Sequence, residues 1–299
     1  MAKRTLGAGL ILILAGCQEA VAPPPDPAYR QEIERWRADR EARLKSDGGW
    51  LTVAGLHWLR EGLNTFGSAP GNDFVLPASA PPKAGAFEFH SGQTRLQVEP
   101  GVTVMVEGNP VSSLELRPDT SKAPTILTLG PLTMQVIQRE DRYGVRLKDN
   151  DSPRRRDFAG LDWYPIREEY RIDARFVPHD QPQRIPIPNV LGQVKDMTSP
   201  GYAVFDLKGQ EVRLHPVLES PEDRALFFIF RDATAPEETY GAGRFLYSDL
   251  PQDGRVELDF NKAYSPPCAF TDFATCPLPP KENRLAARIE AGEKKPPGH

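Results

Sequence analysis

The chain has 299 residues, of which 37 are basic and 41 acidic, giving a formal net charge of −4 at pH 7. Its basic clusters, such as Arg154-Arg155-Arg156, are short enough to be solvated turns. The charge balance therefore speaks against a nucleic-acid partner.

The first residues predict a secretory signal with a lipoprotein processing site. Lys3 and Arg4 form a short positive head, residues 10–15 are apolar, and the box LAGC ends at Cys17. The apolar run is too short to remain as a membrane-spanning helix. We expect residues 1–16 to be removed and the Cys17 thiol to carry diacylglycerol. The alternative is an ordinary secretory peptide in which Cys17 is incidental.

Lipidation at Cys17 predicts a protein of the bacterial cell envelope, with the membrane as a partner through its lipid anchor and the folded part facing the periplasm. Gln18 follows the cysteine, which resembles the pattern sorted to the outer membrane in enterobacteria. Residues 17–27 are rich in proline and predict an extended tether.

A single helix is predicted to open the folded part. Asp26 is a suitable N-cap and Pro27 suits the first turn, and Asp47-Gly48-Gly49 ends the helix. One face repeats at helical spacing, with Tyr29, Ile33, Trp36, Arg40 and Leu44. The charged residues of the other face, from Arg35 through Glu41 and Arg43, are interpreted as solvated.

Period-two alternation then replaces the helical pattern. The first group of expected strands covers residues 50–58, 85–90, 94–98, 102–106, 125–129, 132–139 and 144–148. The second group covers residues 170–176, 184–187, 202–207, 212–216, 225–231, 243–247 and 255–260. Many short strands with close turns predict sandwiches or barrels.

The predicted fold class is all-β, with two antiparallel β domains preceded by one helix. A mature chain of this length suits two small domains better than one. We expect residues 28–155 to hold the helix and an N-terminal β-sandwich. Residues 156–295 are expected to hold a C-terminal β-meander, closed as a barrel or a sandwich, with a proline-rich loop.

Two cysteines remain once Cys17 is assigned to lipid. Cys268 and Cys276 are separated by seven residues, which permits a disulfide or two metal thiolates. A structural zinc needs four ligands, and no other cysteine or histidine lies near in the sequence. We therefore expect a disulfide, worth about 2–3 kcal/mol, and no metal or cofactor.

Several motifs resemble a known family. GGWLTVAGLHWL, FGSAPGNDFVLP, ETYGAGRFLY, LDFNKAYSPPCAF and TCPLPPKENRL, spread over residues 48–285, look like domain of unknown function 1684. The resemblance covers nearly the whole mature chain. It implies a bacterial or archaeal protein, often with a secretion signal, and carries no activity.

The N-terminal part also resembles forkhead-associated sandwiches. FGSAPGNDFVLP, AGAFEFHSGQTRLQV and VMVEGNPV are similar to them in order and spacing. Those domains hold phosphothreonine through Gly-Arg and Ser-Arg-x-His motifs. Here Gly67 is followed by Ser68, and the later position reads Pro82-Lys83-Ala84-Gly85. The resemblance implies the sandwich without the phosphopeptide chemistry.

Polar residues around the last strands form the candidate ligand-binding set. They are Arg231, Asp232, Tyr240, Arg244, Asp259, Asn261, Glu282 and Asn283. In one interpretation Arg244 pairs with Asp259 or Glu282 as a structural clamp, and the asparagines satisfy backbone groups. In the other, the set binds a small polar ligand, an anion or a sugar, in a cleft roofed by residues 266–280.

Three functions remain open. The chain contains no P-loop, Rossmann fingerprint, HExxH or GxSxG motif, so no catalytic residue is predicted and a non-enzymatic protein is favoured. Such a lipoprotein would bind a small polar ligand or an envelope component. The alternatives are a hydrolase using Asp232, Asp259 or Glu282, and a scaffold without a site. A pocket containing Tyr240, Arg244 and Asp259 would favour binding or catalysis, and a buried salt bridge without a cavity would favour a scaffold.

Overall fold

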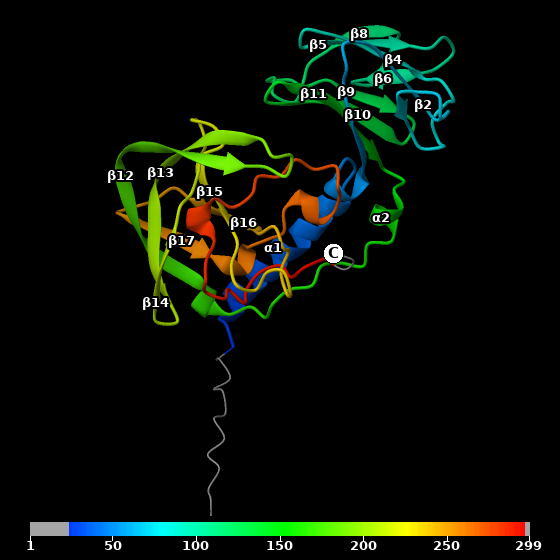
Figure 1. The fold of residues 1–299 in the computed structure, drawn as a ribbon. Helices are drawn as coiled ribbons and strands as arrows, with labels where there is room; N and C mark the ends of the chain where they lie inside the picture. The colour runs from blue at the N-terminus through cyan, green and yellow to red at the C-terminus, as the bar shows by residue number, and fades with distance from the viewer. Residues whose placement is uncertain (1–23, 297–299) are drawn as a thin grey trace, which may run out of the picture.

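The computed structural model describes residues 24–296, so the predicted signal peptide and Cys17 lie outside the described residues. Figure 1 shows an N-terminal part, coloured cyan to green, above a larger C-terminal part. Helix α1 (Pro27–Lys45) runs along the C-terminal part. No helix within residues 24–296 is long and apolar enough to cross a membrane.

The N-terminal part is a sandwich of two sheets. One sheet has the order β1 (Val53–Trp58), β11 (Arg142–Asp149), β10 (Leu132–Arg139), β9 (Ile126–Leu129), β6 (Val104–Val106) and β7 (Asn109–Val111). The other has the order β3 (Phe74–Val75), β2 (Gly62–Gly67), β4 (Gly85–His90), β5 (Gln93–Val98) and β8 (Ser113–Leu116). Phe66, Phe87, Leu96 and Leu132 are completely buried between them. The predicted sandwich architecture is confirmed.

The sequence pattern does not predict every strand of the N-terminal part. The pattern does not predict β2, because Gly62, Asn64 and Gly67 are residues that strands disfavour. Asn64 is nevertheless buried, and its side-chain amide donates to the backbone carbonyls of Arg60 and Phe87. The residue is therefore used to satisfy the backbone at the start of the strand.

The C-terminal part contains a four-stranded sheet and a two-stranded sheet. The first has the order β14 (Gln210–Leu214), β13 (Val194–Leu207), β12 (Arg171–Pro188) and β17 (Arg255–Asp259). The second pairs β15 (Ala225–Phe230) with β16 (Arg244–Asp249). The predicted meander fails at two steps, because β14 and β15 lie in different sheets and β17 pairs with β12 and not with β16. Within residues 24–296 these sheets do not close into a barrel.

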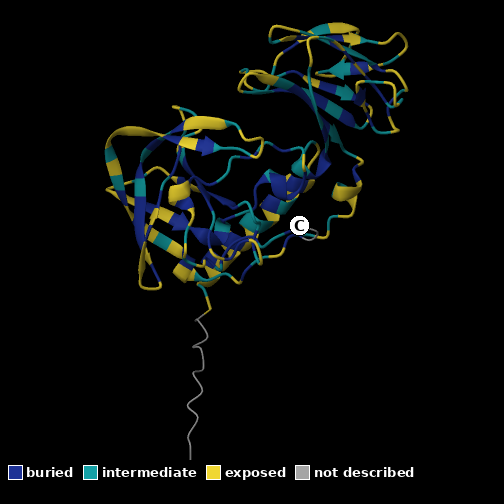
Figure 2. Ribbon diagram, viewed as in Figure 1, coloured by how far each residue is buried: buried dark blue, intermediate teal, exposed yellow. Residues whose placement is uncertain are grey.

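Short helices connect the strands. They are η1 (Trp50–Thr52), α2 (Pro153–Arg156), η2 (Glu168–Tyr170), η3 (Phe260–Lys262), η4 (Pro267–Ala269) and η5 (Lys281–Asn283). The C-terminal core gathers buried side chains from both sheets, among them Phe228, Phe230, Leu246 and Phe260. In Figure 2 the buried residues, coloured dark blue, lie along strands and helices of both parts.

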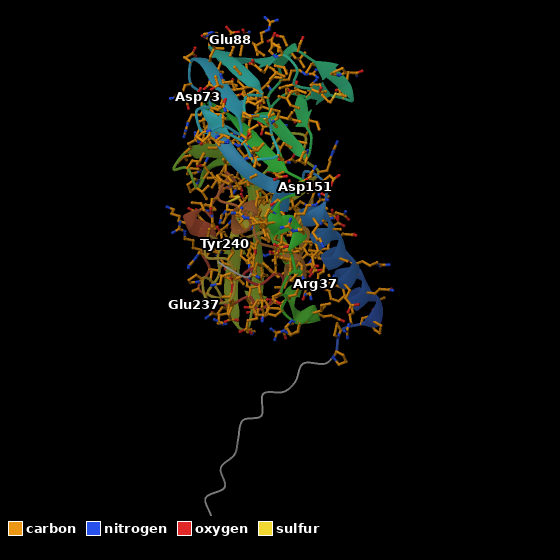
Figure 3. All side chains as sticks on the ribbon, turned by 90° about the vertical axis from the view of Figure 1, so that its right-hand side faces the viewer. Arg37, Asp73, Glu88, Asp151, Glu237 and Tyr240 are labelled. Carbon is orange, nitrogen blue, oxygen red and sulfur yellow. A yellow bond between two sulfur atoms is a disulfide. The ribbon has the colours of Figure 1, made fainter. Side chains whose placement is uncertain are left out.

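Helix α1 packs on the C-terminal part, although it directly precedes the N-terminal sandwich in the chain. Tyr29 Oη donates to Asp259 Oδ1 at 2.9 Å, and Lys262 Nζ lies 2.6 Å from Glu32 Oε1. Arg37, labelled in Figure 3, donates to the Tyr164 carbonyl at 2.9 Å. The expected grouping of the helix with the sandwich in residues 28–155 therefore follows chain order and not packing.

The predicted disulfide between Cys268 and Cys276 is present. The loop that it closes lies at the junction of the two parts, since Thr275 Oγ1 accepts from Arg139 Nε of β10 at 2.9 Å. After the loop, Leu278 N donates to the Pro188 carbonyl of β12 at 2.7 Å. The stapled loop thus connects the C-terminal sheet to the outer face of the N-terminal sandwich.

Candidate functional site

Arg244 and Asp232 form a buried ion pair at the start of β16. Arg244 Nη2 lies 2.9 Å from Asp232 Oδ1, and each side chain is 1% exposed. Arg244 also donates to the carbonyls of Ile289 and Ala291, and Ile289 N donates to Asp232 Oδ2 at 2.8 Å. The pair therefore fastens the C-terminal segment to the core. Arg244 was expected to meet Asp259 or Glu282, and its partner is instead Asp232.

Asp259 and Asn261 belong to a second network, built with α1. Tyr29 Oη donates to Asp259 Oδ1 and accepts from Asn261 Nδ2, each at 2.9 Å. Asn261 also exchanges two hydrogen bonds with the backbone of Arg167. Burial, followed by the Asp259 charge and the hydrogen bond to Asp259, raises the pKa of Tyr29 above its ordinary value. The tyrosine therefore stays protonated and acts as a donor.

The other candidates have separate contacts. Asn283 exchanges hydrogen bonds with the backbone of His215. Arg231 donates to the Gly241 and Ala235 carbonyls. Tyr240, labelled in Figure 3, donates to the Cys268 carbonyl at 3.2 Å. Glu282 lies at the surface beside Lys281.

The structure thus divides the candidate set among several networks instead of bringing it to one patch. Asparagine side chains satisfy backbone groups, as the clamp interpretation requires. The Arg244–Asp232 pair is a buried salt bridge, and neither residue lines any of the pockets described below. A buried salt bridge away from these pockets is what the structural-clamp interpretation predicts.

A pocket of about 220 Å³ lies between α1 and the C-terminal part. We call it the helix pocket. Its lining residues are Trp36, Arg40, Arg43, Tyr247, Lys262 and Tyr264. Residues 36, 40 and 43 share one face of α1, because they are spaced by four and three positions. The others come from β16 and from the segment that begins at η3, so only tertiary folding assembles the pocket.

Positive charge is unequally compensated in the helix pocket. Arg40 Nε lies 3.3 Å from Glu293 Oε2, and Arg40 Nη2 donates to the Ser265 carbonyl at 2.9 Å. Lys262 contacts Glu32 and Asp259. Within residues 24–296, no carboxylate lies within ion-pairing distance of Arg43. The Arg43 guanidinium is therefore available to an anionic ligand.

The aromatic side chains of the helix pocket supply apolar walls, and the Tyr247 hydroxyl donates to Glu219 Oε2 at 2.8 Å. The Arg40 guanidinium lies 4.6 Å from the centre of the Tyr264 ring. Burial raises the pKa of Tyr264 to about 12 and also raises the pKa of Tyr247, so both phenols are protonated at neutral pH. No carboxylate or histidine lines the pocket. This lining suits binding of an anion and lacks a general base.

The stapled loop borders a different and larger pocket, of about 750 Å³. It is lined mainly by apolar residues, including Leu51, Phe158, Ala269 and Phe270, with Thr271 and Asp272 from the loop. None of the eight candidate residues lines it. At this pocket the stapled loop therefore does not cover the candidate polar residues. It borders a mainly apolar pocket instead.

No group of three or more histidine, cysteine, aspartate or glutamate side chains within residues 24–296 is arranged to hold a metal ion. The rings of His179 and His215 lie with their centres 6.3 Å apart, and Tyr202 stacks against His215. Burial lowers the pKa of His215. This arrangement is an aromatic stack on the face of β13.

Comparison with known proteins identifies a family without an assigned activity. Residues 156–294 match the family described as Protein of unknown function (DUF1684). No curated protein matches the chain. An uncharacterized protein of Haloarcula marismortui, solved by NMR, is 33% identical with a TM-score of 0.41; the match covers 49% of this chain and 82% of that one.

Two solved structures that contain FHA domains are more distantly similar, at 16% identity and a TM-score of 0.23. One is the FhaA FHA domain complexed with an intracellular domain, and the match covers 97% of that chain. The other comes from work on phosphothreonine-dependent FHA domain interactions, and the match covers 92% of that chain. Each match covers 31% of this chain.

Proposed function

We propose that this chain, whose residues 156–294 match the DUF1684 family, is a lipid-anchored protein of the bacterial envelope that binds a small anionic ligand in the helix pocket. The observation that carries the binding role is Arg43, which lines the pocket without a carboxylate partner among the described residues. Arg40 and Lys262 add positive charge beside it. The LAGC box ending at Cys17 supports the anchor.

The size and lining of the helix pocket define the class of ligand. Its volume of about 220 Å³ is below the range of about 300–1,000 Å³ typical of drug-sized ligands. A guanidinium prefers a carboxylate or phosphate, and Trp36, Tyr247 and Tyr264 suit a sugar or a planar ring. We therefore propose an acidic sugar or a small aromatic acid as the ligand class.

Binding is favoured over catalysis by the position of the carboxylates. Glycoside hydrolysis, for example, needs two carboxyl groups facing one bond. Asp232 is committed to Arg244 and Thr234, and Asp259 to Tyr29 and Asn261. Neither lines the helix pocket, and no other carboxylate or histidine lines it.

Replacing Arg43 by glutamine is expected to weaken ligand binding by about tenfold or more, because a charge-assisted hydrogen bond is lost. Titration of the soluble domain, the purified chain without residues 1–17, with galacturonate, benzoate and inorganic phosphate, followed by tryptophan fluorescence, measures the effect. Arg35→Gln is the matched control, since Arg35 is exposed on the same helix and does not line the pocket. Equal affinities of the two variants, or no binding of any probe by the wild type, would contradict the proposal.

The anchor is tested separately in cells. Cys17→Ala is expected to leave the protein in the soluble envelope fraction and to abolish labelling by palmitate, because the acylated thiol is lost. Gln18→Asp keeps that thiol and serves as the control; in an enterobacterial host it is expected to move the protein from the outer to the inner membrane. Continued membrane association of Cys17→Ala would rule out this anchor.

A further inference from the structure

Arg146 is a buried cation, and two of its three guanidinium nitrogens have no hydrogen-bonding partner among the described residues. Its side chain projects from β11, between Val145 and Leu147 of the sandwich core, and alternation places it on the opposite, outer face of the sheet. The residue is only 7% exposed. Its Nε and Nη2 atoms are buried, and no described residue accepts a hydrogen bond from them. The Trp50 ring centre lies 5.2 Å from the guanidinium carbon.

Lys148 is a second cation on the same face, two residues along β11. Its Nζ donates to the Gly48 carbonyl, in the turn that follows α1. Asp47, the acidic residue of that turn, pairs with Arg155 at 2.6 Å. Within residues 24–296, neither Arg146 nor Lys148 forms an ion pair. Arg146 is therefore buried and Lys148 half-buried, and neither has a counter-charge among the described residues.

The pKa values of both cations are lowered at this site. Burial, followed by the Arg139 charge, lowers the pKa of Arg146 to about 10, while Asp119 acts in the opposite direction. Burial and the Arg146 charge also lower the pKa of Lys148. Asp119 itself is engaged with Arg139 at 2.8 Å. Uncompensated buried charge is destabilising, and where a fold retains it a function is a common reason.

These cations line a pocket of about 330 Å³, within the size range typical of ligand sites. The wall includes Thr133 and Gln135 of β10, which pair in register with Lys148 and Arg146. Their side chains add a hydroxyl and an amide donor to the two cations. At the rim lies Ile126 of β9, which is 44% exposed. Figure 3 places Asp151, close to this site in sequence, at the junction of the two parts.

We propose that this pocket binds an oxyanion, a carboxylate or a phosphate carried by a small molecule, at a second site distinct from the helix pocket. The Arg146 guanidinium and the Lys148 ammonium would provide the counter-charge, with Thr133 and Gln135 as further donors. Ile126 offers an apolar contact to the body of the ligand. The turn at Asp47 and Gly48 lines the same pocket and joins it to the end of α1, and the Asp47 carboxylate there is paired with Arg155.

The alternative is that Arg146 is a structural residue, held by stacking on Trp50. The two roles predict opposite effects of substitution. A structural arginine stabilises the protein, so its loss lowers the melting temperature. A ligand-binding arginine that is buried without a partner destabilises the free protein, so an apolar residue of similar length raises the melting temperature.

The test measures melting temperatures of the soluble domain in sodium phosphate, sodium acetate and sodium chloride at equal pH and ionic strength. We expect phosphate or acetate to raise the wild-type melting temperature by about 2–4 °C more than chloride does. Phosphate alone identifies a phosphoryl ligand, and acetate alone a carboxylate. Arg146→Met is expected to raise the anion-free value by about 2 °C and to abolish the part of the anion-dependent shift that Arg43→Gln retains.

Arg142→Met is the matched control, because Arg142 lies on the same strand over the Trp58 ring but is exposed and outside the pocket. It should retain the full anion-dependent shift, whereas Arg43→Gln should lose only the part of the shift that arises in the helix pocket. Lys148→Gln, which leaves Arg146 in place, should weaken anion binding in this pocket by about tenfold. A wild-type response equal to that in chloride, a destabilised Arg146→Met, or a normal response of Lys148→Gln would each overturn the proposal.

Discussion

Replacing Arg244 by methionine is expected to lower the free energy of unfolding by about 3–5 kcal/mol. The substitution leaves the Asp232 carboxylate buried without its cation, and a buried charge without a partner is strongly destabilising. The carbonyls of Ile289 and Ala291 lose their donor at the same time. The C-terminal segment should therefore detach before the rest of the domain unfolds.

Urea unfolding of the soluble domain measures this loss. Arg255→Met is the matched control, because Arg255 pairs with Asp173 at 2.6 Å on the surface, where both side chains are more than half exposed. Such a pair is worth about 1 kcal/mol or less. Adding Asp232→Leu to Arg244→Met should recover part of the loss, since no charge then remains buried. A loss below about 1 kcal/mol for Arg244→Met, together with impaired ligand binding, would return Arg244 to the list of ligand-binding residues.

The partner of Arg244 illustrates what the sequence can predict. Local patterns identified α1 from its N-cap and the disulfide from cysteine counting, because both depend on few residues. The register of β15 and β16 pairs Phe230 with Arg244, so Asp232 lies just beyond the paired end of β15. A hairpin register would have suggested this partner. The prediction of Asp259 instead assumed that β17 pairs with β16, whereas β17 pairs with β12.

The helix pocket could not be predicted, because its walls are distant in the chain. Arg40 was assigned to the packed face of α1 and Arg43 to a solvated face, and helical periodicity alone supports both assignments. Only the docking of α1 on the C-terminal part brings them to Tyr247 and Lys262. The helix joins the N-terminal sandwich covalently and the C-terminal part by contact, and sequence order reveals only the first relation.

Arg146 was missed for a related reason. Strand alternation correctly places residues 145 and 147 inside the sandwich and residue 146 outside it. An arginine at an outward position is normally solvated, and the strand pattern contains nothing that indicates a covering layer. Here the covering group is Trp50, which precedes β1 and stacks on the guanidinium. Burial of an outward-facing charge is thus a tertiary property.

Replacing Arg40 by methionine is expected to lower the free energy of unfolding by about 3 kcal/mol at pH 7. Glu293 is fully buried, and its Oε1 has no hydrogen-bonding partner among the described residues. Burial raises the pKa of Glu293, and the Arg40 charge opposes that rise. Without Arg40, the carboxyl group must be protonated in the folded state. Protonation costs about 1.4 kcal/mol for each pH unit above its ordinary pKa, so the loss should shrink to about 1 kcal/mol near pH 5.

The sign of the pH dependence separates this mechanism from loss of packing. Because the pKa of Glu293 is raised on folding, the folded protein binds more protons than the unfolded chain between the two pKa values. The stability that this group contributes is therefore complete below the unfolded pKa and falls as pH rises through the folded pKa.

Replacing Glu293 by glutamine removes that pH dependence of the stability. Urea unfolding from pH 5 to 8 should thus show a loss for Arg40→Met that grows with pH, and a nearly constant loss when Glu293→Gln is also present. His57 and His215 titrate alike in all variants, so their contributions cancel in the differences. A loss for Arg40→Met that is independent of pH would mean that Arg40 acts by packing on Tyr264 and Phe270, and not by compensating the Glu293 charge.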